Sequence, residues 1–376
     1  MPLTSLRVEN YRSLRSVELP LQPLTVITGP NGSGKSNLYR SLWLLAQIAE
    51  GGFGRALARE GGLVSALWAG QRSNQKPVRM SLGIRTDDFS FQLCCGFPQP
   101  GGARNSFPLD AEIKEEAIWF GPKRKPSTTL LERNGAVTRA RDRSGVWTEY
   151  QLELSENESV LSQLREPERF PELYTIRDQV RGWRFYHGFR TEPGSPLREP
   201  QVSVRTPVLN HDGGDLAAAL QTIFDMGAGD LATRAIDRAF PGCALEIVTS
   251  KRRDSLGYDV PGAPELSVGL RMPGCLRTLH ARELSDGTLR YLCLVAALLS
   301  ERPCELIALN EPESSLHPEL IRPLAGLIVD ASRRSQVWVT THSEALAKSI
   351  EEQSGVRTTQ LGLVQGETRI ESSDNE

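Results

Sequence analysis

The stretch GPNGSGKS, Gly29 to Ser36, constrains the fold more than any other part of the sequence. It fits the pattern G-x-x-x-x-G-K-[ST], in which backbone N–H groups of a glycine-rich turn surround phosphate oxygens at the start of a helix. The apolar run PLTVITG precedes the turn, and Leu38, Leu42 and Leu45 follow it at helical spacing. Strand, loop and helix together predict half of a βαβ unit with a phosphate site at its turn.

Several residues of this loop are candidates for holding a nucleotide. They are Asn31, Gly32, Ser33, Gly34, Lys35 and Ser36. Lys35 would reach the β- and γ-phosphates, and the Ser36 hydroxyl would ligate Mg²⁺. The alternative is a glycine-rich turn that happens to contain a lysine, but the position between strand and helix favours the phosphate loop. The loop alone does not separate a small-molecule kinase, a GTPase and a motor.

Two further motifs lie in the C-terminal half. The run LSDGT at 284–288 places Ser285 and Gly287 directly before an apolar helix, an arrangement that helix capping alone also explains. The apolar run from Leu306 to Leu309 predicts a buried strand that ends in Asn310 and Glu311. Strand tips are where open α/β sheets build their sites, so this polar tip predicts a functional position.

These motifs, with TTHS at 340–343, resemble the ABC-type ATPase heads in order and approximate spacing. The opening LRVENYRSL and the stretch EPESSLHP resemble the RecF, SMC and OLD branch, over roughly residues 3 to 50 and 210 to 345. The resemblance implies an α/β fold: a P-loop NTPase with an ABC-ATPase-like mixed sheet flanked by helices, plus a small β-rich and helical insertion. The predicted domains are 1–84 with the P-loop, 85–209 as the insertion, and 210–376 with the remaining motifs.

The resemblance also implies a role for each motif residue, with ATP and Mg²⁺ as cofactors. Ser285 and Gly287 of one subunit would contact the γ-phosphate held by the P-loop of a second, so a homodimer is expected on ATP binding. Glu311 would polarise the attacking water, and His342 would act as a switch residue at the γ-phosphate. The loop Ser314 to His317 would face the partner subunit.

Asn310 departs from the family pattern, which usually has an acidic residue there. Its amide oxygen can still orient a metal-bound water, so Asn310 is predicted together with Ser36 as a metal residue. The lost negative charge predicts weaker Mg²⁺ retention or slower hydrolysis. Glu311 and Glu313 remain nearby, which argues against a dead site.

Between 78 and 155 the pattern predicts a β meander with a hairpin at Asn134-Gly135. The stretch GPKRKP and arginines 133, 139, 141 and 143 form a local basic cluster on these hairpins, which is either a solvated face or a DNA contact. The whole chain has 44 Lys plus Arg against 46 Asp plus Glu, which excludes a global electrostatic case for nucleic acid. Gln71 and Gln75 are weak candidates for a Mg²⁺-sensing glutamine, and His187 receives no role.

The remaining features predict a cytoplasmic protein. The six cysteines form no C-x-x-C pair, which predicts reduced thiols. The longest apolar run, at 291–299, is about half of what a bilayer span requires, and the N-terminus lacks a signal-peptide pattern. No membrane association is therefore expected.

Together these features predict an ATP-hydrolysing RecF/SMC-like ATPase that dimerises around ATP and acts on DNA or a partner protein, in DNA repair or genome defence. A partner nuclease or effector protein fits this prediction. One alternative is a nucleotide-gated scaffold with little or no turnover, which Asn310 favours. The other is a transporter ATPase subunit, against which the EPESSLHP stretch argues.

Overall fold

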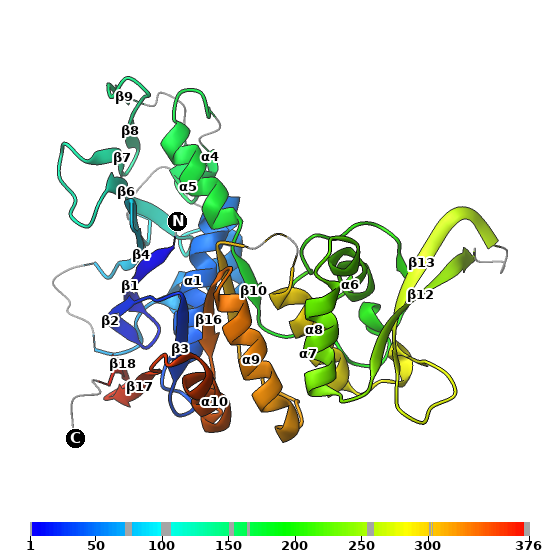
Figure 1. Ribbon diagram of the computed structural model, residues 1–376. Coiled ribbons are helices and arrows are strands. Elements are labelled where there is room, and N and C mark those ends of the chain that lie inside the picture. Colours follow the sequence, from blue (N-terminus) through cyan, green and yellow to red (C-terminus); the bar gives the residue numbers. More distant parts are fainter. Residues whose placement is uncertain are drawn as a thin grey trace. The chain divides into compact units, whose positions relative to one another are not determined.

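The computed structural model describes residues 2–71, 77–98, 107–149, 154–163, 166–253, 259–300, 302 and 304–371. Its contacts divide the chain into two compact units, Met1–Trp183 with Thr359–Glu376, and Arg184–Thr358. Figure 1 labels many of the elements of both units. The boundaries of these two units differ from those of the three domains expected above. The domain boundaries therefore stay a prediction.

An antiparallel sheet dominates the first unit. In the described residues its strand order is β2 (Leu14–Pro20), β1 (Leu3–Tyr11), β4 (Met80–Thr86), β5 (Phe89–Gly96), β6 (Glu112–Phe120), β7 (Thr129–Asn134), β8 (Val137–Arg141) and β9 (Trp147–Glu149). The meander predicted for this region is confirmed, and Asn134 pairs with Val137 across a tight turn in which Gly135 has a φ of 59°. A positive φ is what glycine adopts without steric cost.

The predicted strand, loop and helix around Gly29–Ser36 are also present in the first unit. Strand β3 (Leu24–Thr28) pairs in parallel with β17 (Thr359–Val364), which continues into the antiparallel β18 (Glu367–Ile370). Helix α1 (Lys35–Glu50) contacts β1 and β4 of the large sheet. The other helices of this unit are α2 (Phe53–Arg59), α3 (Gly62–Ala66), α4 (Val160–Gln163) and α5 (Pro171–Arg181). Leu38, Leu42 and Leu45 of α1 are buried, as their spacing predicts.

Three parallel strands carry the C-terminal motifs in the second unit: β10 (Arg184–Tyr186), β15 (Leu306–Asn310) and β16 (Gln336–Thr340), with β15 in the middle. Leu306, Ile307, Ala308 and Leu309 are at most 2% exposed. Burial of each large aliphatic side chain contributes about 1.5 to 3 kcal/mol, so this strand is firmly anchored. Parallel strands buried on both faces are characteristically apolar throughout, which explains the unbroken run.

Helices and a second sheet complete this unit. Helices α9 (Ile321–Ser332) and α10 (Glu344–Ser354) pack side by side (Figure 1). Helix α8 (Asp286–Leu298) contacts α6 (Leu216–Asp225), α7 (Gly229–Ala239) and α9. The second sheet contains β11 (Gln201–Val202), β13 (Asp259–Arg271), β12 (Ala244–Arg253) and β14 (Leu279–His280). Short 3₁₀ turns cover Pro196–Arg198, Ala281–Glu283 and Pro318–Leu320.

Within the described residues, every helix is too short or too polar to cross a membrane. All six cysteines are free thiols. Cys95 and Cys293 are buried, and burial raises the pKa of both thiols. Cys275 is exposed.

Candidate functional site

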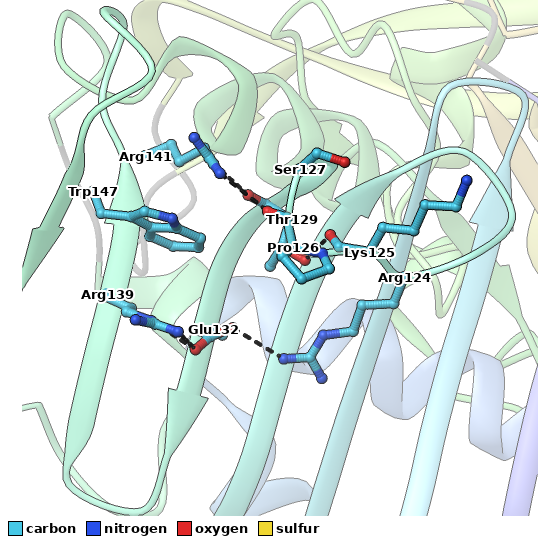
Figure 2. Close-up of a pocket in the computed structure, with 9 residues that line it drawn as sticks. All are labelled: Arg124, Lys125, Pro126, Ser127, Thr129, Glu132, Arg139, Arg141 and Trp147. Atoms are coloured by element: carbon cyan, nitrogen blue, oxygen red, sulfur yellow. Dashed lines mark hydrogen bonds and ion pairs between the residues drawn. The ribbon is translucent and has the colours of Figure 1, made fainter.

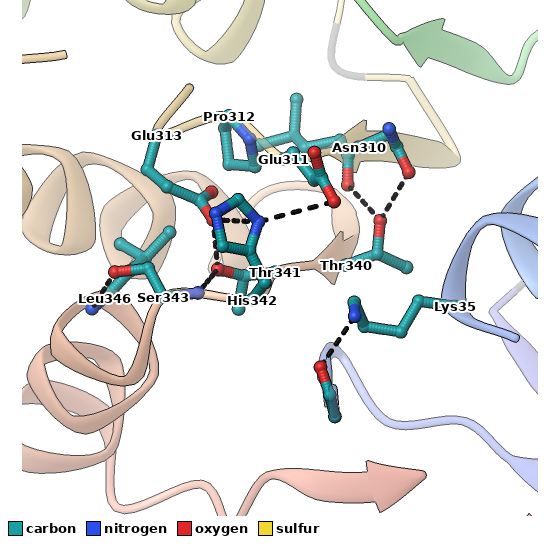
Figure 3. Close-up of polar contacts among 12 residues, drawn as sticks. Lys35, Asn310, Glu311, Pro312, Glu313, Thr340, Thr341, His342, Ser343 and Leu346 are labelled. Atoms are coloured by element: carbon teal, nitrogen blue, oxygen red, sulfur yellow. Dashed lines mark hydrogen bonds and ion pairs between the residues drawn. The ribbon is translucent and has the colours of Figure 1, made fainter. Parts of the chain in front are cut away.

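The loop from Gly29 to Ser36 ends at helix α1 without a side-chain cap. Gly34 occupies the N-cap position with a φ of 104°, and among the described residues no side chain caps the helix and its first turn holds no acidic residue. Lys35 is only 5% exposed, and its Nζ donates to the carbonyl oxygens of Gly29 at 2.6 Å and Pro30 at 3.0 Å (Figure 3). The ammonium group is therefore held inside the loop, where an anion would meet it.

The C-terminal hairpin of β17 and β18 packs against this loop. A Cβ atom on Gly34 would lie 2.1 Å from Oγ1 of Thr368 on β18, so only glycine fits here. The Thr368 hydroxyl is 2.7 Å from the Ser13 hydroxyl, which also accepts a hydrogen bond from Asn37 Nδ2 at 2.8 Å. This chain of polar contacts joins the β1–β2 turn, the hairpin and the start of α1.

The loop residues fit a nucleotide phosphate and its metal ion. Ser33 Oγ is buried and has no hydrogen-bond partner among the described residues, so a ligand oxygen would satisfy it. Ser36 is exposed on the first turn of α1, as are Asn31 and Gly32 before it. The described residues contain no cluster of three or more His, Cys, Asp or Glu side chains that could hold a metal ion. Mg²⁺ usually takes only one or two side-chain ligands besides substrate phosphates and waters, so it does not need such a cluster.

Asn310 ends strand β15 and is engaged on both sides of its amide. Its Oδ1 accepts a hydrogen bond from the Thr340 hydroxyl at 2.9 Å, and its Nδ2 lies 2.9 Å from His187 Nδ1. Because the amide nitrogen only donates, His187 Nδ1 is the acceptor and Nε2 carries the proton of the neutral ring. The strand register explains the cluster, since Thr340 ends β16 opposite Asn310 and His187 directly follows β10.

Glu311 turns out of the strand with a left-handed φ of 48°, a conformation that non-glycine residues rarely adopt. Its backbone N–H donates to the Thr340 carbonyl at 2.8 Å, which keeps the turn in place. Its carboxylate is 32% exposed, and Oε1 lies 3.3 Å from His342 Nδ1. The half-exposed imidazole of His342 also lies 3.7 Å from Glu313 Oε1 (Figure 3).

Glu313 lies deeper than Glu311. Its carboxylate is 6% exposed, and Oε1 accepts a hydrogen bond from the Thr341 hydroxyl at 2.5 Å. Among the described residues, no partner reaches Oε2. The carboxylates of Glu311 and Glu313 therefore both face the His342 imidazole. That of Glu311 is partly exposed to solvent, and that of Glu313 is hydrogen-bonded to Thr341.

Helix α8 connects the Ser285 region to the strand tip within the second unit. Exposed Ser285 is its N-cap, with Oγ accepting from the Thr288 backbone N–H at 3.2 Å. A Cβ atom on Gly287 would lie 2.8 Å from the Ser315 carbonyl oxygen, so this glycine permits close packing against the loop after Glu311. Arg290 donates to the Glu311 carbonyl at 3.0 Å, and burial lowers the pKa of its guanidinium.

The structure thus places Asn310, Glu311 and His342 together, and in the predicted loop the Lys35 ammonium group contacts the carbonyl oxygens of Gly29 and Pro30. It also brings His187 next to Asn310, although the sequence assigns His187 no role. A polar residue directly after a short aromatic strand was the available signal, but strand neighbours are not visible in sequence. Gln71 is exposed, and Gln75 lies outside the described residues.

A phosphate loop on β3 and α1, with an Asn-Glu strand tip, a TTHS turn and a capped LSDGT helix, defines this protein as an ABC-type P-loop ATPase of the RecF, SMC and OLD branch. The chain belongs to the family described as "AAA domain, putative AbiEii toxin, Type IV TA system", which matches residues 151–348. A second family, described as "AAA ATPase domain", matches residues 1–72.

Two curated proteins show local similarity. The chain is 34% identical over 88 residues to the DNA replication and repair protein RecF of Corynebacterium jeikeium (strain K411), which covers 23% of this chain and 21% of that protein. It is 49% identical over 43 residues to the OLD nuclease of Thermus scotoductus (strain ATCC 700910 / SA-01), which covers 11% of this chain and 8% of the nuclease. The chain thus spans about a fifth or less of the length of these relatives.

Solved SMC heads share the fold. An SMC head bound to the C-winged helix domain of ScpA matches with a TM-score of 0.52 and 13% identity, covering 99% of this chain and 98% of that one. An SMC head with an extended coiled coil, bound to the C-terminal domain of ScpA derived from Pyrococcus furiosus, matches with a TM-score of 0.52 and 13% identity, covering 98% and 96%. The predicted fold class, a P-loop NTPase with an ABC-type mixed sheet and flanking helices, is confirmed.

Proposed function

We propose that this protein binds ATP with Mg²⁺, hydrolyses the ATP, and closes into a homodimer around it to act on DNA or on a partner protein. The observation that carries the proposal is the contact of Glu311 Oε1 with His342 Nδ1 at 3.3 Å, on a partly exposed strand tip. A carboxylate that is held by an imidazole and open to solvent can orient a water molecule and accept its proton.

Each motif residue has a role in this proposal. Lys35 and the first N–H groups of α1 would hold the phosphates of ATP, while Ser36 and the Asn310 amide oxygen would hold Mg²⁺. The bound metal ion would neutralise phosphate charge. Glu311 accepts a proton from the attacking water, and His342 keeps the Glu311 side chain in position.

Dimerisation rests on the LSDGT turn. Ser285 is exposed, and its hydroxyl already caps α8, so the turn is structured before any partner arrives. Gly287 packs against Ser315, which places the turn beside the loop expected to face a second subunit. These features support a surface that contacts the nucleotide of another copy of the chain.

The strand tip also favours a second candidate function, a nucleotide-gated scaffold with little or no turnover. Asn310 lacks the negative charge that would hold Mg²⁺, and its amide is engaged by Thr340 and His187. Steady-state phosphate release, with and without DNA, separates the two functions. Release no faster than that of a Lys35→Ala control supports the scaffold, whereas release clearly above it supports hydrolysis.

A basic cavity on the β7–β9 hairpins supports DNA as a partner (Figure 2). The cavity has a volume of about 580 Å³, and its lining comprises Arg124, Lys125, Pro126, Ser127, Thr129, Glu132, Arg139, Arg141 and Trp147. Arg139 and Arg141 lie 4.9 and 4.7 Å from the centre of the Trp147 ring, which holds both guanidinium groups in place.

The charges in this cavity are only partly compensated. Glu132 pairs with Arg124 and Arg139, whereas Arg141 donates to the carbonyl oxygens of Thr129, Gly145 and Pro126. The positive charge of Arg141 therefore has no carboxylate partner among the described residues. Such a group can pair with a phosphate without first breaking a salt bridge.

The names of the relatives support two settings for this activity. The RecF relative is named for DNA replication and repair, and the family description names a putative toxin and a toxin–antitoxin system. The SMC heads are described as bound to ScpA, which is compatible with a protein partner here, and a nuclease or effector is the partner we propose. We propose that the ATPase acts in DNA repair or genome defence, and in the cytoplasm.

A further inference from the structure

Arg198 is a buried arginine in the segment 190–207, which is rich in proline, arginine and serine. Its side chain is 8% exposed and lies on the 3₁₀ turn Pro196–Arg198 of the second unit. Nε donates to the Thr191 carbonyl at 2.7 Å, which ties the guanidinium group to a residue close by in the chain. The other two nitrogens reach residues more than 80 positions further along the chain.

These contacts all fall on the stretch that leads into helix α8. One terminal nitrogen donates to the carbonyl oxygens of Ala281 and Leu284, both at 2.9 Å, and to that of Arg282 at 3.3 Å. The other donates to Asp286 Oδ1 at 2.6 Å. Leu284 and Asp286 are the two neighbours of Ser285, so Arg198 holds the chain immediately before and immediately after that serine.

The geometry requires arginine. The planar guanidinium presents five N–H donors in a fixed fork, so it can bind carbonyl groups and a carboxylate in two directions at once. Lysine has a single side-chain nitrogen, so it cannot bind the carbonyl groups before Ser285 and the Asp286 carboxylate after it in the same way. Without this donor the buried carbonyl groups would lose their hydrogen-bond partner, which costs free energy. The turn would then shift to expose them to water.

We propose that Arg198 is a positioning residue that holds Ser285 and Gly287 in the arrangement needed to contact the nucleotide of the partner subunit. The inference rests on the dimerisation proposed above and adds the residue that sets the shape of the contacting turn. In the proposed dimer, Arg198 itself does not touch the nucleotide. It acts through the backbone of Ala281 to Asp286.

The test measures ATP-dependent dimerisation by light scattering in a Glu311→Gln background, in which hydrolysis is expected to stop. Arg198→Lys should weaken the dimer at least tenfold in Kd, whereas binding of a fluorescent ATP analogue to the monomer should stay unchanged. Hydrogen exchange of the nucleotide-free protein should speed up over residues 281–288 and stay the same elsewhere. Asp286→Asn, at a half-exposed side chain, should shift dimerisation and exchange in the same direction by less.

Arg190→Lys is the matched control, because Arg190 lies on the same segment, is 55% exposed, and pairs with Glu192 only among the described side chains. It should dimerise like the parent protein. If Arg198→Lys and Asp286→Asn both have the melting temperature, the hydrogen-exchange rates and the dimer Kd of the parent protein, the positioning role is wrong. If the Glu311→Gln parent itself stays monomeric with ATP, the proposed dimerisation has failed instead, and the exchange data then show whether Arg198 holds the turn in the monomer.

Discussion

Asn310 and His187 form a hydrogen-bonded pair, with Asn310 Nδ2 lying 2.9 Å from His187 Nδ1. Because the amide must donate, the imidazole is held in the tautomer whose proton is on Nε2. The opposite edge of the same amide accepts from Thr340. Asn310, which stands where the family usually has an acidic residue, is therefore part of an ordered cluster of hydrogen bonds.

Asn310→Asp should raise Mg²⁺ affinity or turnover, by about tenfold, the lower end of what outer-shell groups contribute to metal sites. The carboxylate restores a negative charge near the metal and keeps an acceptor for the Thr340 hydroxyl. Phosphate release measured over a Mg²⁺ titration checks this, with Asn310→Ala as the control that removes both polar atoms. No change in either Mg²⁺ affinity or rate would show that Asn310 lies away from the metal.

Glu311→Gln should trap the protein as a dimer at saturating ATP and Mg²⁺. The substitution keeps the size of the side chain but removes the group that accepts a proton from water. Light scattering should show the dimer mass with ATP and the monomer mass without it, and phosphate release should fall by at least 10²-fold. A Glu311→Gln protein that stays monomeric with ATP would overturn the model of a nucleotide shared between subunits.

Ser285→Arg should have the opposite effect. The bulky side chain would fill the space expected for the γ-phosphate of the partner's nucleotide, while the P-loop of each monomer stays intact. Binding of a fluorescent ATP analogue should be unchanged, and both dimerisation and hydrolysis should be lost. Normal dimerisation together with normal hydrolysis would mean that Ser285 does not face a nucleotide.

Reversal of Arg139 and Arg141 to glutamate should weaken DNA binding for all sequences about equally. Both guanidinium groups line the basic cavity, and phosphate contacts give an affinity that falls with salt. Fluorescence anisotropy at several salt concentrations should show a shallower salt slope for the variant. Arg7→Glu with Arg15→Glu is the control, because it reverses two exposed arginines on β1 and β2 of the same sheet. Equal losses in both double variants would indicate a general charge effect, and binding unchanged by the reversal at 139 and 141 would place any DNA contact elsewhere.

Gly34→Ala should destabilise the first unit and abolish nucleotide binding. The new Cβ would lie 2.1 Å from Thr368 Oγ1, and the φ of 104° is itself unfavourable for alanine by about 1 to 2 kcal/mol. Adding Thr368→Ala removes the two closest atoms but not the backbone strain. Thermal denaturation should therefore show partial recovery in the double variant. Recovery to the wild-type melting temperature would mean that only the clash matters, and no recovery would mean that only the backbone conformation does.

The local structure of the loop Gly29–Ser36 and of the strand tip could be predicted from the sequence because it depends on residues next to each other in the chain. A glycine-rich turn between an apolar strand and an amphipathic helix specifies its own local structure, and Leu306 to Leu309 specify a buried strand that must deliver Asn310 and Glu311 at its end. The β meander followed for the same reason, since turn residues and alternating side chains act over short distances.

The partners of these motifs were decided only by the tertiary structure. His187 meets Asn310 from 123 positions away, Arg198 meets Asp286 from 88, and Thr368 meets Ser13 from 355. Such pairs depend on which strands become neighbours and where a loop closes, and neither follows from local propensity or periodicity. The sequence alone therefore determined which residues form the loop and the strand tip, whereas the packing of distant strands and loops decided which residues contact them.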